Sequence, residues 1–180
     1  LTILQGSCFD LVLDFICYQS SDLDQLMASI STKRYILISS TWLPRLWSGT
    51  RADELITDPT HVASELPDVT LNYLSGKLSV EQALTRLRET GCVAVSLRLP
   101  IMLGEGDHTG RFDFYRSRLA DGGPLILVDG GENLAQIAVM EDLAQAIARW
   151  CIDVDICRFP VWEALPGEGR SIRCIIELMA

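Results

Sequence analysis

Short continuous runs of apolar residues alternate along this chain with longer stretches in which apolar residues recur every three or four positions. Continuous runs are typical of parallel strands that are covered on both faces, and the spaced pattern is typical of amphipathic helices. The runs predict strands at 9–17, 35–40, 93–99, 124–128 and 158–165. The spaced stretches predict helices at 22–30, 72–90, 111–119, 141–150 and 171–179. Two strand–helix–strand units in succession predict an α/β fold built on a parallel sheet.

Local signals mark particular positions of the predicted helices. Asp22 and Gln25, three residues apart, predict a capping box, and Ser171 is expected to be the N-cap of the last helix. Gly76 lies inside the helix at 72–90, where it costs about 1 kcal/mol of helix propensity relative to Ala. We therefore expect Gly76 to let a backbone segment or a cofactor approach the helix closely.

The second predicted strand ends abruptly in three hydroxyl side chains, Ser39, Ser40 and Thr41. Ligands of open α/β sheets bind at the carboxyl ends of strands, so these hydroxyls are expected to face a cleft. Tyr73 and Lys77 are four residues apart and share one face of the predicted helix. An ammonium there favours the phenolate and is expected to lower the pKa of Tyr73. These groups predict a proton-transfer site, and the alternative is a surface tyrosine with a solvated lysine.

Four segments of the chain resemble motifs of one family and occur in the order in which that family has them. They are the strand at 35–40, the Tyr73-x-x-x-Lys77 pair, LRLPIMLGEGD at 97–107 and VMEDLA at 139–144. Over nearly its whole length the chain resembles the extended short-chain dehydrogenase/reductases of the NAD-dependent epimerase/dehydratase type. The resemblance implies a Rossmann-like parallel sheet with flanking helices, and NAD or NADP as cofactor.

The resemblance also implies roles for individual residues. Tyr73 is expected to be the catalytic base and Lys77 to bind the ribose of the cofactor. Ser40 is expected to hydrogen-bond the substrate oxygen, with Ser39 and Thr41 as near alternatives. The residues implied in cofactor binding are Leu13, Asp14, Phe15, Ser39, Tyr73, Lys77, Leu99, Pro100 and Ile101. The residues implied beside the substrate are Thr41, Trp42 and Arg111.

Three of these residues have a second interpretation that the sequence leaves open. Asp14 equally well caps the turn that follows its strand. Trp42 equally well covers the edge of the core, and an arginine at a helix start, such as Arg111, is commonly solvated. His108 is expected to be a loop residue without a catalytic role, because nothing pairs with it in the sequence.

The glycine-rich turn that holds the pyrophosphate in dinucleotide-binding domains is absent from this sequence. The family pattern begins before the first strand found here, so the sheet is expected to be incomplete at its N-terminus. We predict a partial dinucleotide-binding Rossmann domain at 1–103 and, at 104–180, a partial C-terminal substrate-binding lobe interleaved with the last Rossmann elements. The chain alone is expected to bind dinucleotide poorly and to need the missing N-terminal segment.

Two departures from the sugar-nucleotide epimerases bear on the substrate. Those enzymes commonly carry an Arg shortly before the segment matched by 139–144, where it binds the diphosphate, but this chain has LAQI at 134–137. Trp42-Leu43-Pro44 also follows the strand end where relatives often have Val-Tyr-Gly. A buried diphosphate without a bidentate cation is costly. A small-molecule substrate with a smaller or more apolar alcohol or carbonyl is therefore expected.

The composition excludes several other classes of function. The 180 residues carry a formal net charge of −9, which argues against a nucleic-acid partner because phosphate binding relies on Lys and Arg. Six scattered cysteines and two histidines lack metal-site spacing, so reduced thiols and no metal are expected. No apolar run approaches the ~20 residues that span a bilayer, and no secretory signal appears. A cytoplasmic location without a membrane anchor is expected.

Two classes of function remain open at this stage. The first is an oxidoreductase or epimerase/dehydratase of a biosynthetic pathway, and the second is a non-catalytic Rossmann-like module that senses a ligand or binds protein or RNA. The presence of Tyr73, Lys77 and Ser40 favours the enzyme, and the acidic charge argues against RNA. The choice between NAD and NADP and a homodimeric assembly both stay open.

Overall fold

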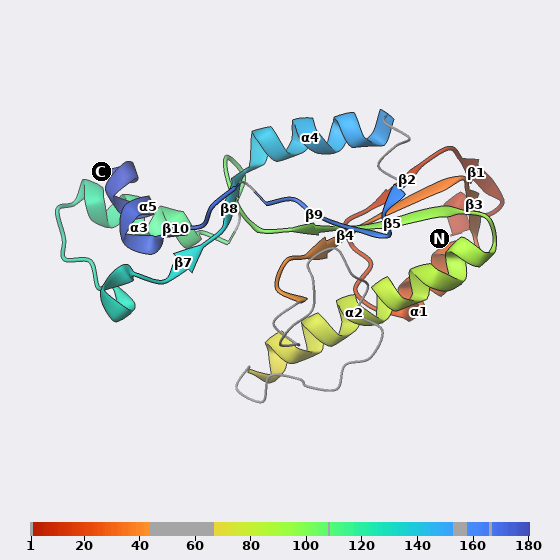
Figure 1. The fold of residues 1–180 in the computed structure, drawn as a ribbon, viewed down its shortest axis with the longest axis horizontal. Coiled ribbons are helices and arrows are strands. Elements are labelled where there is room, and N and C mark those ends of the chain that lie inside the picture. The colour runs from red at the N-terminus through yellow and green to blue at the C-terminus, as the bar shows by residue number, and fades with distance from the viewer. Residues whose placement is uncertain (1, 44–66, 108, 153–157, 166) are drawn as a thin grey trace. The chain divides into compact units, whose positions relative to one another are not determined.

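The computed structural model describes residues 2–43, 67–107, 109–152, 158–165 and 167–180 (Figure 1). Most of the predicted connection at 42–68 lies outside the described residues, as does His108. The chain divides into two compact units, Leu1–Leu99 with Trp150–Ala164 and Pro100–Arg149 with Leu165–Ala180. The chain thus leaves the first unit after Leu99 and returns to it at Trp150.

The first unit is built on a four-stranded sheet in which every strand runs parallel to its neighbours. In spatial order the strands are β2 (Val12–Asp14), β4 (Arg34–Ser40), β5 (Val93–Leu99) and β9 (Val161–Glu163). β4 and β5 pair along their whole lengths and end together, with Ser40 opposite Leu99. Nearly all residues of both strands are buried, as their continuous apolar runs predict. The predicted α/β fold with a parallel sheet is confirmed.

The first predicted strand is wrong in its bounds. After the 3-10 helix η1 (Thr2–Leu4), the chain forms β1 (Ser7–Phe9), which pairs in parallel with β3 (Ile30–Thr32), and then β2, which ends at Asp14. The carboxylate of Asp14 accepts hydrogen bonds from the backbone N–H groups of Ile16 and Cys17, at 2.9 Å each. These bonds turn the chain away from the sheet, although the apolar run continues.

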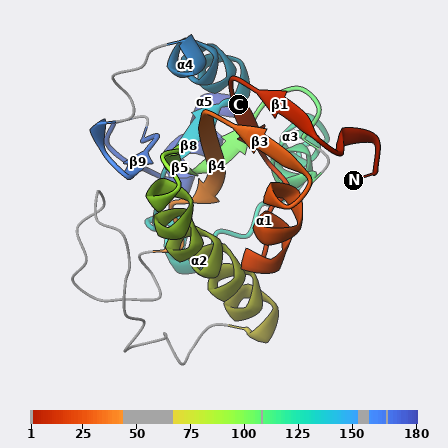
Figure 2. The same ribbon diagram turned by 90° about the vertical axis from the view of Figure 1, so that its right-hand side faces the viewer.

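Two helices, α1 (Ser20–Met27) and α2 (Asp68–Glu89), pack side by side, and α2 covers β4 and β5 (Figure 2). Both begin earlier than their apolar spacing predicts. In α1 the reason is Asp22, whose Oδ2 accepts a hydrogen bond from the backbone N–H of Gln19 at 2.9 Å. Gln19 is therefore the N-cap, and the predicted capping box of Asp22 with Gln25 is wrong.

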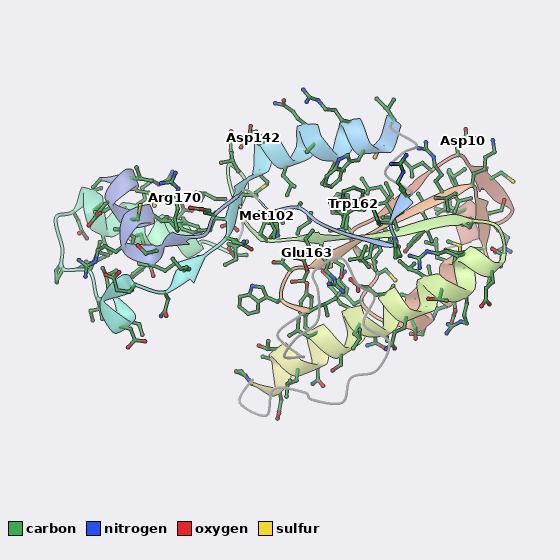
Figure 3. The ribbon with its side chains drawn as sticks, viewed as in Figure 1. Asp10, Met102, Asp142, Trp162, Glu163 and Arg170 are labelled. Carbon is green, nitrogen blue, oxygen red and sulfur yellow. The ribbon has the colours of Figure 1, made fainter. Side chains whose placement is uncertain are left out.

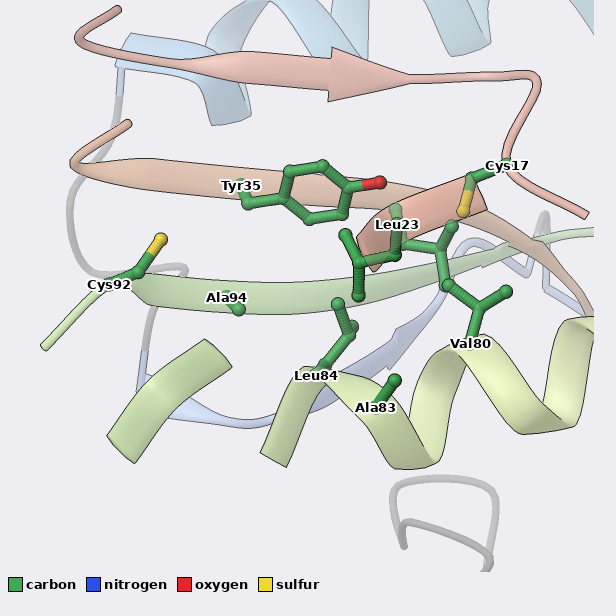
Figure 4. Close-up of a cluster of buried hydrophobic side chains, with 9 residues drawn as sticks. Cys17, Leu23, Tyr35, Val80, Ala83, Leu84, Cys92 and Ala94 are labelled. Carbon is green, nitrogen blue, oxygen red and sulfur yellow. The ribbon is translucent and has the colours of Figure 1, made fainter. Parts of the chain in front are cut away.

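The core beneath α1 and α2 consists of aliphatic side chains together with two thiols and one phenol (Figure 4). Its buried members are Cys17, Leu23, Tyr35, Leu37, Val80, Ala83, Leu84, Cys92 and Ala94. A buried phenol needs a hydrogen-bond partner, and the hydroxyl of Tyr35 donates to Oδ2 of Asp14 at 2.7 Å. Burial and this hydrogen bond raise the pKa of Tyr35 far above its ordinary value.

An ion-pair network is buried where α2 meets β5. The guanidinium of Arg98 donates to both carboxylate oxygens of Glu81, at 2.7 Å and 3.0 Å, and to Glu163 of β9 at 3.3 Å. Oγ of Ser96 donates to the carboxylate of Glu81 at 2.7 Å. Figure 3 labels Glu163 on β9, next to Trp162. The network ties α2 to two strands of the sheet, and each buried charge depends on its partner.

The second unit contains small paired strands and short helices. β6 (Ile101–Leu103) pairs in parallel with β8 (Ile137–Val139), and β7 (Leu134–Ala135) pairs antiparallel with β10 (Arg170–Ser171). Its other elements are α3 (Arg111–Ala120), the 3-10 helix η3 (Val128–Gly131), α4 (Met140–Ile152) and α5 (Ile172–Met179). The last residues of α4, from Trp150, belong to the first unit.

The last three predicted helices are confirmed by α3, α4 and α5. Ser171 is the N-cap of α5, and its Oγ accepts a hydrogen bond from the backbone N–H of Cys174 at 3.1 Å. The predicted strand at 124–128 is wrong, because this segment pairs with no strand among the described residues. Ile126 and Val128 are mostly exposed, so no partner buries the apolar side chains that suggested a strand.

Some general properties follow from the described residues. None of their helices is long and apolar enough to cross a membrane. The five cysteines in this part of the chain are free thiols. No group of three or more His, Cys, Asp or Glu residues that could hold a metal ion lies within the described residues. Burial raises the pKa of Cys17 to about 11, so this thiol is protonated at neutral pH.

Candidate active site at the end of β4

The carboxyl end of β4 carries two serines in different environments. Ser40 is half-buried, and its Oγ accepts a hydrogen bond from the backbone N–H of Trp42 at 3.1 Å. Ser39 is only 5% exposed, and its Oγ has no hydrogen-bond partner among the described residues. A buried hydroxyl without a partner costs about 1–3 kcal/mol. Ser39 therefore offers a polar group that a ligand can satisfy.

Tyr73, on α2, lies against this strand end, and its ring is 6.1 Å from that of Tyr18, centroid to centroid. Tyr73 is 40% exposed, and burial of the rest of its side chain raises its pKa, an effect that the side chain of Ser40 offsets only in part. The prediction that Lys77 lowers the pKa of Tyr73 is therefore wrong. Burial dominates the shift, and Lys77 is not among the groups that contribute to it.

Lys77 lies one turn further along α2 and is only 3% exposed, so it is not a solvated surface lysine. Its Nζ donates to the carbonyl oxygens of Ile38 at 2.8 Å and Cys17 at 2.9 Å, and lies 4.5 Å from the centroid of the Tyr18 ring. An ammonium has three N–H donors. Two of them are used in these bonds, and the third has no hydrogen-bond acceptor among the described residues.

The segment after β2 is fastened to α2 beside Lys77. Oγ of Ser79 accepts a hydrogen bond from the backbone N–H of Ser20 at 3.1 Å and donates to the carbonyl of Gly76 at 2.7 Å. A Cβ atom at Gly76 would overlap the carbonyl oxygen of Tyr18. The expectation that Gly76 admits a backbone segment is confirmed.

We expect Gly76→Ala to lower the free energy of unfolding by about 1–3 kcal/mol. Alanine has the better helix propensity, but its methyl group would displace the backbone carbonyl of Tyr18, which has no alternative rotamer. Urea denaturation of both proteins measures the difference. Thr85→Ala, on the exposed face of the same helix, is the control and is expected to change stability by less than about 0.5 kcal/mol. Equal stability of Gly76→Ala and the wild type would contradict the close approach.

The remaining predicted cofactor residues of the first unit lie at strand ends. Leu13 is partly buried in β2, and Phe15 is exposed just beyond it. Leu99 is buried at the end of β5, opposite Ser40. Both carboxylate oxygens of Asp14 accept hydrogen bonds from the protein, so its side chain takes the capping role.

The other predicted residues lie after the ends of β4 and β5. Thr41 and Trp42 directly follow β4 and are partly exposed, and the backbone N–H of Thr41 donates to the last carbonyl of β5 at 3.0 Å. Pro100 and Ile101 belong to the second unit, where Ile101 begins β6, and Arg111 begins α3 there. The structure thus groups Ser39, Ser40, Tyr73 and Lys77 in one place.

Sequence reasoning missed the contributions of Tyr18 and Tyr35. Tyr18 lies between Lys77 and Tyr73, and Tyr35 binds the carboxylate of Asp14. A signal for the second was present, because Asp14 interrupts an apolar run and a buried carboxylate needs donors. No local pattern pointed to Tyr18.

The second unit contains a cavity of about 800 Å³, bordered by the loop after β6 and by α3. Its charged lining residues are Glu105, Asp107, Asp113 and Arg116. Arg116 pairs with Asp113 at 2.6 Å, so the charged lining is negative on balance. Such a lining disfavours an anionic diphosphate.

Comparison with known proteins gives matches in structure only. No protein-family profile and no curated protein sequence matches the chain. A dTDP-glucose 4,6-dehydratase from Bacillus anthracis, solved with NAD, matches with a TM-score of 0.66 at 14% identity, over 94% of this chain and 56% of its own. A UDP-glucuronic acid 4-epimerase from Bacillus cereus, also solved with NAD, matches with a TM-score of 0.68 at 18% identity, over 89% and 49%.

A third match is the UDP-N-acetylglucosamine 4-epimerase from Methanobrevibacter ruminantium, solved with UDP-N-acetylmuramic acid. It has a TM-score of 0.66 at 18% identity, over 98% of this chain and 61% of its own. The chain therefore has the Rossmann-like fold of NAD-dependent epimerases and dehydratases, as its motifs predict. It spans roughly half to three-fifths of the length of these three structures.

Proposed function

We propose that this chain carries the catalytic part of an NAD(P)-dependent oxidoreductase or epimerase/dehydratase that acts on a hydroxyl or carbonyl group. The observation that carries the proposal is the grouping at the end of β4. The buried ammonium of Lys77, with one donor that has no acceptor among the described residues, lies one helical turn from Tyr73. The phenol of Tyr73 interacts with the side chain of Ser40. Ligands of open parallel sheets bind at this position.

The residues present fit a nicotinamide dinucleotide. The spare N–H of Lys77 suits a ribose hydroxyl, and the unpartnered Oγ of Ser39 offers a second buried contact. The structures from Bacillus anthracis and Bacillus cereus were both solved with NAD, which supports the same class of cofactor here. The choice between NAD and NADP is a matter for measurement.

Tyr73 and Ser40 handle the substrate oxygen, Tyr73 by proton transfer and Ser40 by hydrogen bonding. A bound nicotinamide supplies or accepts the hydride. In the direction of carbonyl reduction, the phenol of Tyr73 donates its proton to the substrate oxygen while the hydroxyl of Ser40 donates a hydrogen bond to it. Burial raises the pKa of Tyr73, so the phenol is protonated at neutral pH and ready to act as this acid. In the reverse direction the same phenol, once ionised, accepts the proton.

We place the substrate among alcohols or carbonyl compounds without a diphosphate. The LAQI segment at 134–137 supports this, because no bidentate cation stands there.

Tight binding of the cofactor is proposed to require an additional N-terminal segment. Within the described residues, β2 is hydrogen-bonded on one side only, to β4, so its other edge is open to a further strand. No glycine-rich turn is present in the sequence to hold the pyrophosphate. An N-terminal segment would add a strand beside β2 and would also supply the glycine-rich turn.

The proposal is tested by Lys77→Met in the protein that includes any segment N-terminal to Leu1. Dissociation constants for NAD and NADP are measured by calorimetry. The variant is expected to weaken binding of the preferred dinucleotide at least about 10-fold, because it removes a charge-assisted hydrogen bond to the ribose. Lys33→Met is the matched control, since Lys33 is exposed and pairs only with Asp10 at 2.8 Å. Equal affinity in Lys77→Met and Lys33→Met would contradict the proposal.

A further inference from the structure

Lys77 is held by two carbonyl groups whose positions are fixed in different ways. The carbonyl of Ile38 belongs to β4, an inner strand that pairs with β2 and β5, so the sheet itself fixes it. The carbonyl of Cys17 belongs to the turn after β2, outside any strand or helix. The position of the Cys17 carbonyl must therefore be fixed by interactions outside regular secondary structure.

Asp14 fixes this turn through hydrogen bonds to its carboxylate. Its Oδ1 accepts from the backbone N–H groups of Ile16 and Cys17 at 2.9 Å each, and these bonds shape the turn whose last carbonyl receives Lys77. Its Oδ2 accepts from the hydroxyl of Tyr35 at 2.7 Å, which anchors the carboxylate to β4. The side chain of Asp14 is 8% exposed, so these bonds form away from bulk solvent.

The structure assigns to Asp14 the role of positioning residue for Lys77, exerted through the turn of Ile16 and Cys17 and anchored by Tyr35. The consequence of this role for cofactor binding rests on the proposed function, but the role itself is a property of the folded chain. Among the carboxylates near Lys77, Asp14 has the largest effect on its ammonium.

The turn after β2, β2 itself, α1 and α2 each contribute a titratable group near Lys77. Burial lowers the pKa of Lys77, and four groups raise it: Cys17 of the turn, Asp14 of β2, Glu81 of α2 and Asp22 of α1. The carboxylate of Glu81 accepts a hydrogen bond from Arg98, and that of Asp22 accepts one from the N-cap residue of α1. Cys17 is uncharged at neutral pH, because burial raises its pKa to about 11. Asp14 is therefore the carboxylate whose removal should affect Lys77 most.

The chain has only two lysines, Lys33 and Lys77, which makes a direct test possible. With ¹³C-labelled lysine, the Cε signals of both residues can be followed by NMR through a pH titration, and Lys77→Met assigns them. Asp14→Asn keeps an oxygen acceptor for the turn but removes the charge and an acceptor for Tyr35. It is expected to lower the pKa of Lys77 and to leave that of Lys33 unchanged.

If Asp14→Asn does not fold, Asp14→Ser replaces it, because a serine hydroxyl also accepts from a nearby backbone N–H in a turn. The same downward shift is expected. Asp14→Glu restores the charge with altered reach, and is expected to recover the pKa of Lys77 but not its wild-type Cε chemical shift. A folded Asp14→Asn protein in which the Lys77 signal keeps its wild-type Cε chemical shift and titrates as in the wild type would overturn the inference.

The two proposals fail in different ways. If Lys77→Met binds dinucleotide as well as the wild type while Asp14→Asn shifts the Lys77 titration, the proposed function fails and the positioning role stands. If Lys77→Met loses binding while Asp14→Asn leaves the Lys77 signal unchanged, the positioning role fails and the proposed function stands. In the enzyme, Asp14→Asn is further expected to raise the KM for the dinucleotide more than it lowers kcat.

Discussion

Tyr73→Phe is expected to lower kcat by about 10²- to 10⁴-fold and to leave the affinity for the dinucleotide within about threefold. The change removes one oxygen atom from a ring whose other contacts, with Tyr18 and with α2, are made by carbon atoms. Proton transfer to or from the substrate oxygen then lacks the phenol that is proposed to carry it out. Steady-state kinetics with a panel of small alcohols and carbonyl compounds, in the protein that includes any N-terminal segment, measures the effect.

Tyr115→Phe is the matched control for this experiment. Tyr115 belongs to α3 in the second unit, where its ring contacts Phe114 and Phe112, and the same atom is removed from it. The control is expected to keep kcat within about twofold of the wild type. Equal turnover by Tyr73→Phe and the wild type would end the enzymatic interpretation and favour a non-catalytic ligand-sensing or protein-binding module on the same sheet.

Arg98→Met is expected to lower the free energy of unfolding by about 3–5 kcal/mol. The methionine fills much of the same volume, but it leaves the fully buried carboxylate of Glu81 without its charged partner, and Ser96 alone cannot replace two charge-assisted hydrogen bonds. Chemical denaturation followed by circular dichroism gives the difference.

Arg86→Met is the control for Arg98→Met. Arg86 lies on the same helix as Glu81 and pairs with Asp24 at 3.3 Å, but both partners are well exposed, so this pair is expected to contribute less than about 1 kcal/mol. A comparable loss of stability in the two variants would show that burial does not set the importance of the Arg98 network.

Local regularities were enough to predict most strands and helices of this fold. β5 begins and ends where the apolar run at 93–99 does, and β4 differs from its prediction by one residue. Both strands are inner strands, so their residues are apolar or paired, with Ser39 as an exception, and the sequence displays this pattern directly. The errors fell where side chains decide the backbone. Asp14 ends β2 within an apolar run, Asp22 starts α1 early, and the run at 124–128 pairs with no strand in the part of the chain that the structure describes.

The candidate site divides in the same way. The order of Ser40, Tyr73 and Lys77 and their family resemblance could be recognised in the sequence, because helical spacing and strand ends are local features. The predicted direction of the pKa shift of Tyr73 is wrong, because burial dominates that shift and burial is decided by tertiary packing.

By itself, the sequence determined a parallel α/β sheet, its main helices and the residue types at the end of β4. Only the tertiary structure decided which groups are partners: Asp14 with Tyr35, Lys77 with Cys17 and Ile38, and Arg98 with Glu81. Periodicity and capping act over a few residues, so they can be read along the chain. Burial and hydrogen bonding between residues 17 to 60 positions apart depend on register and packing, which no local pattern specifies.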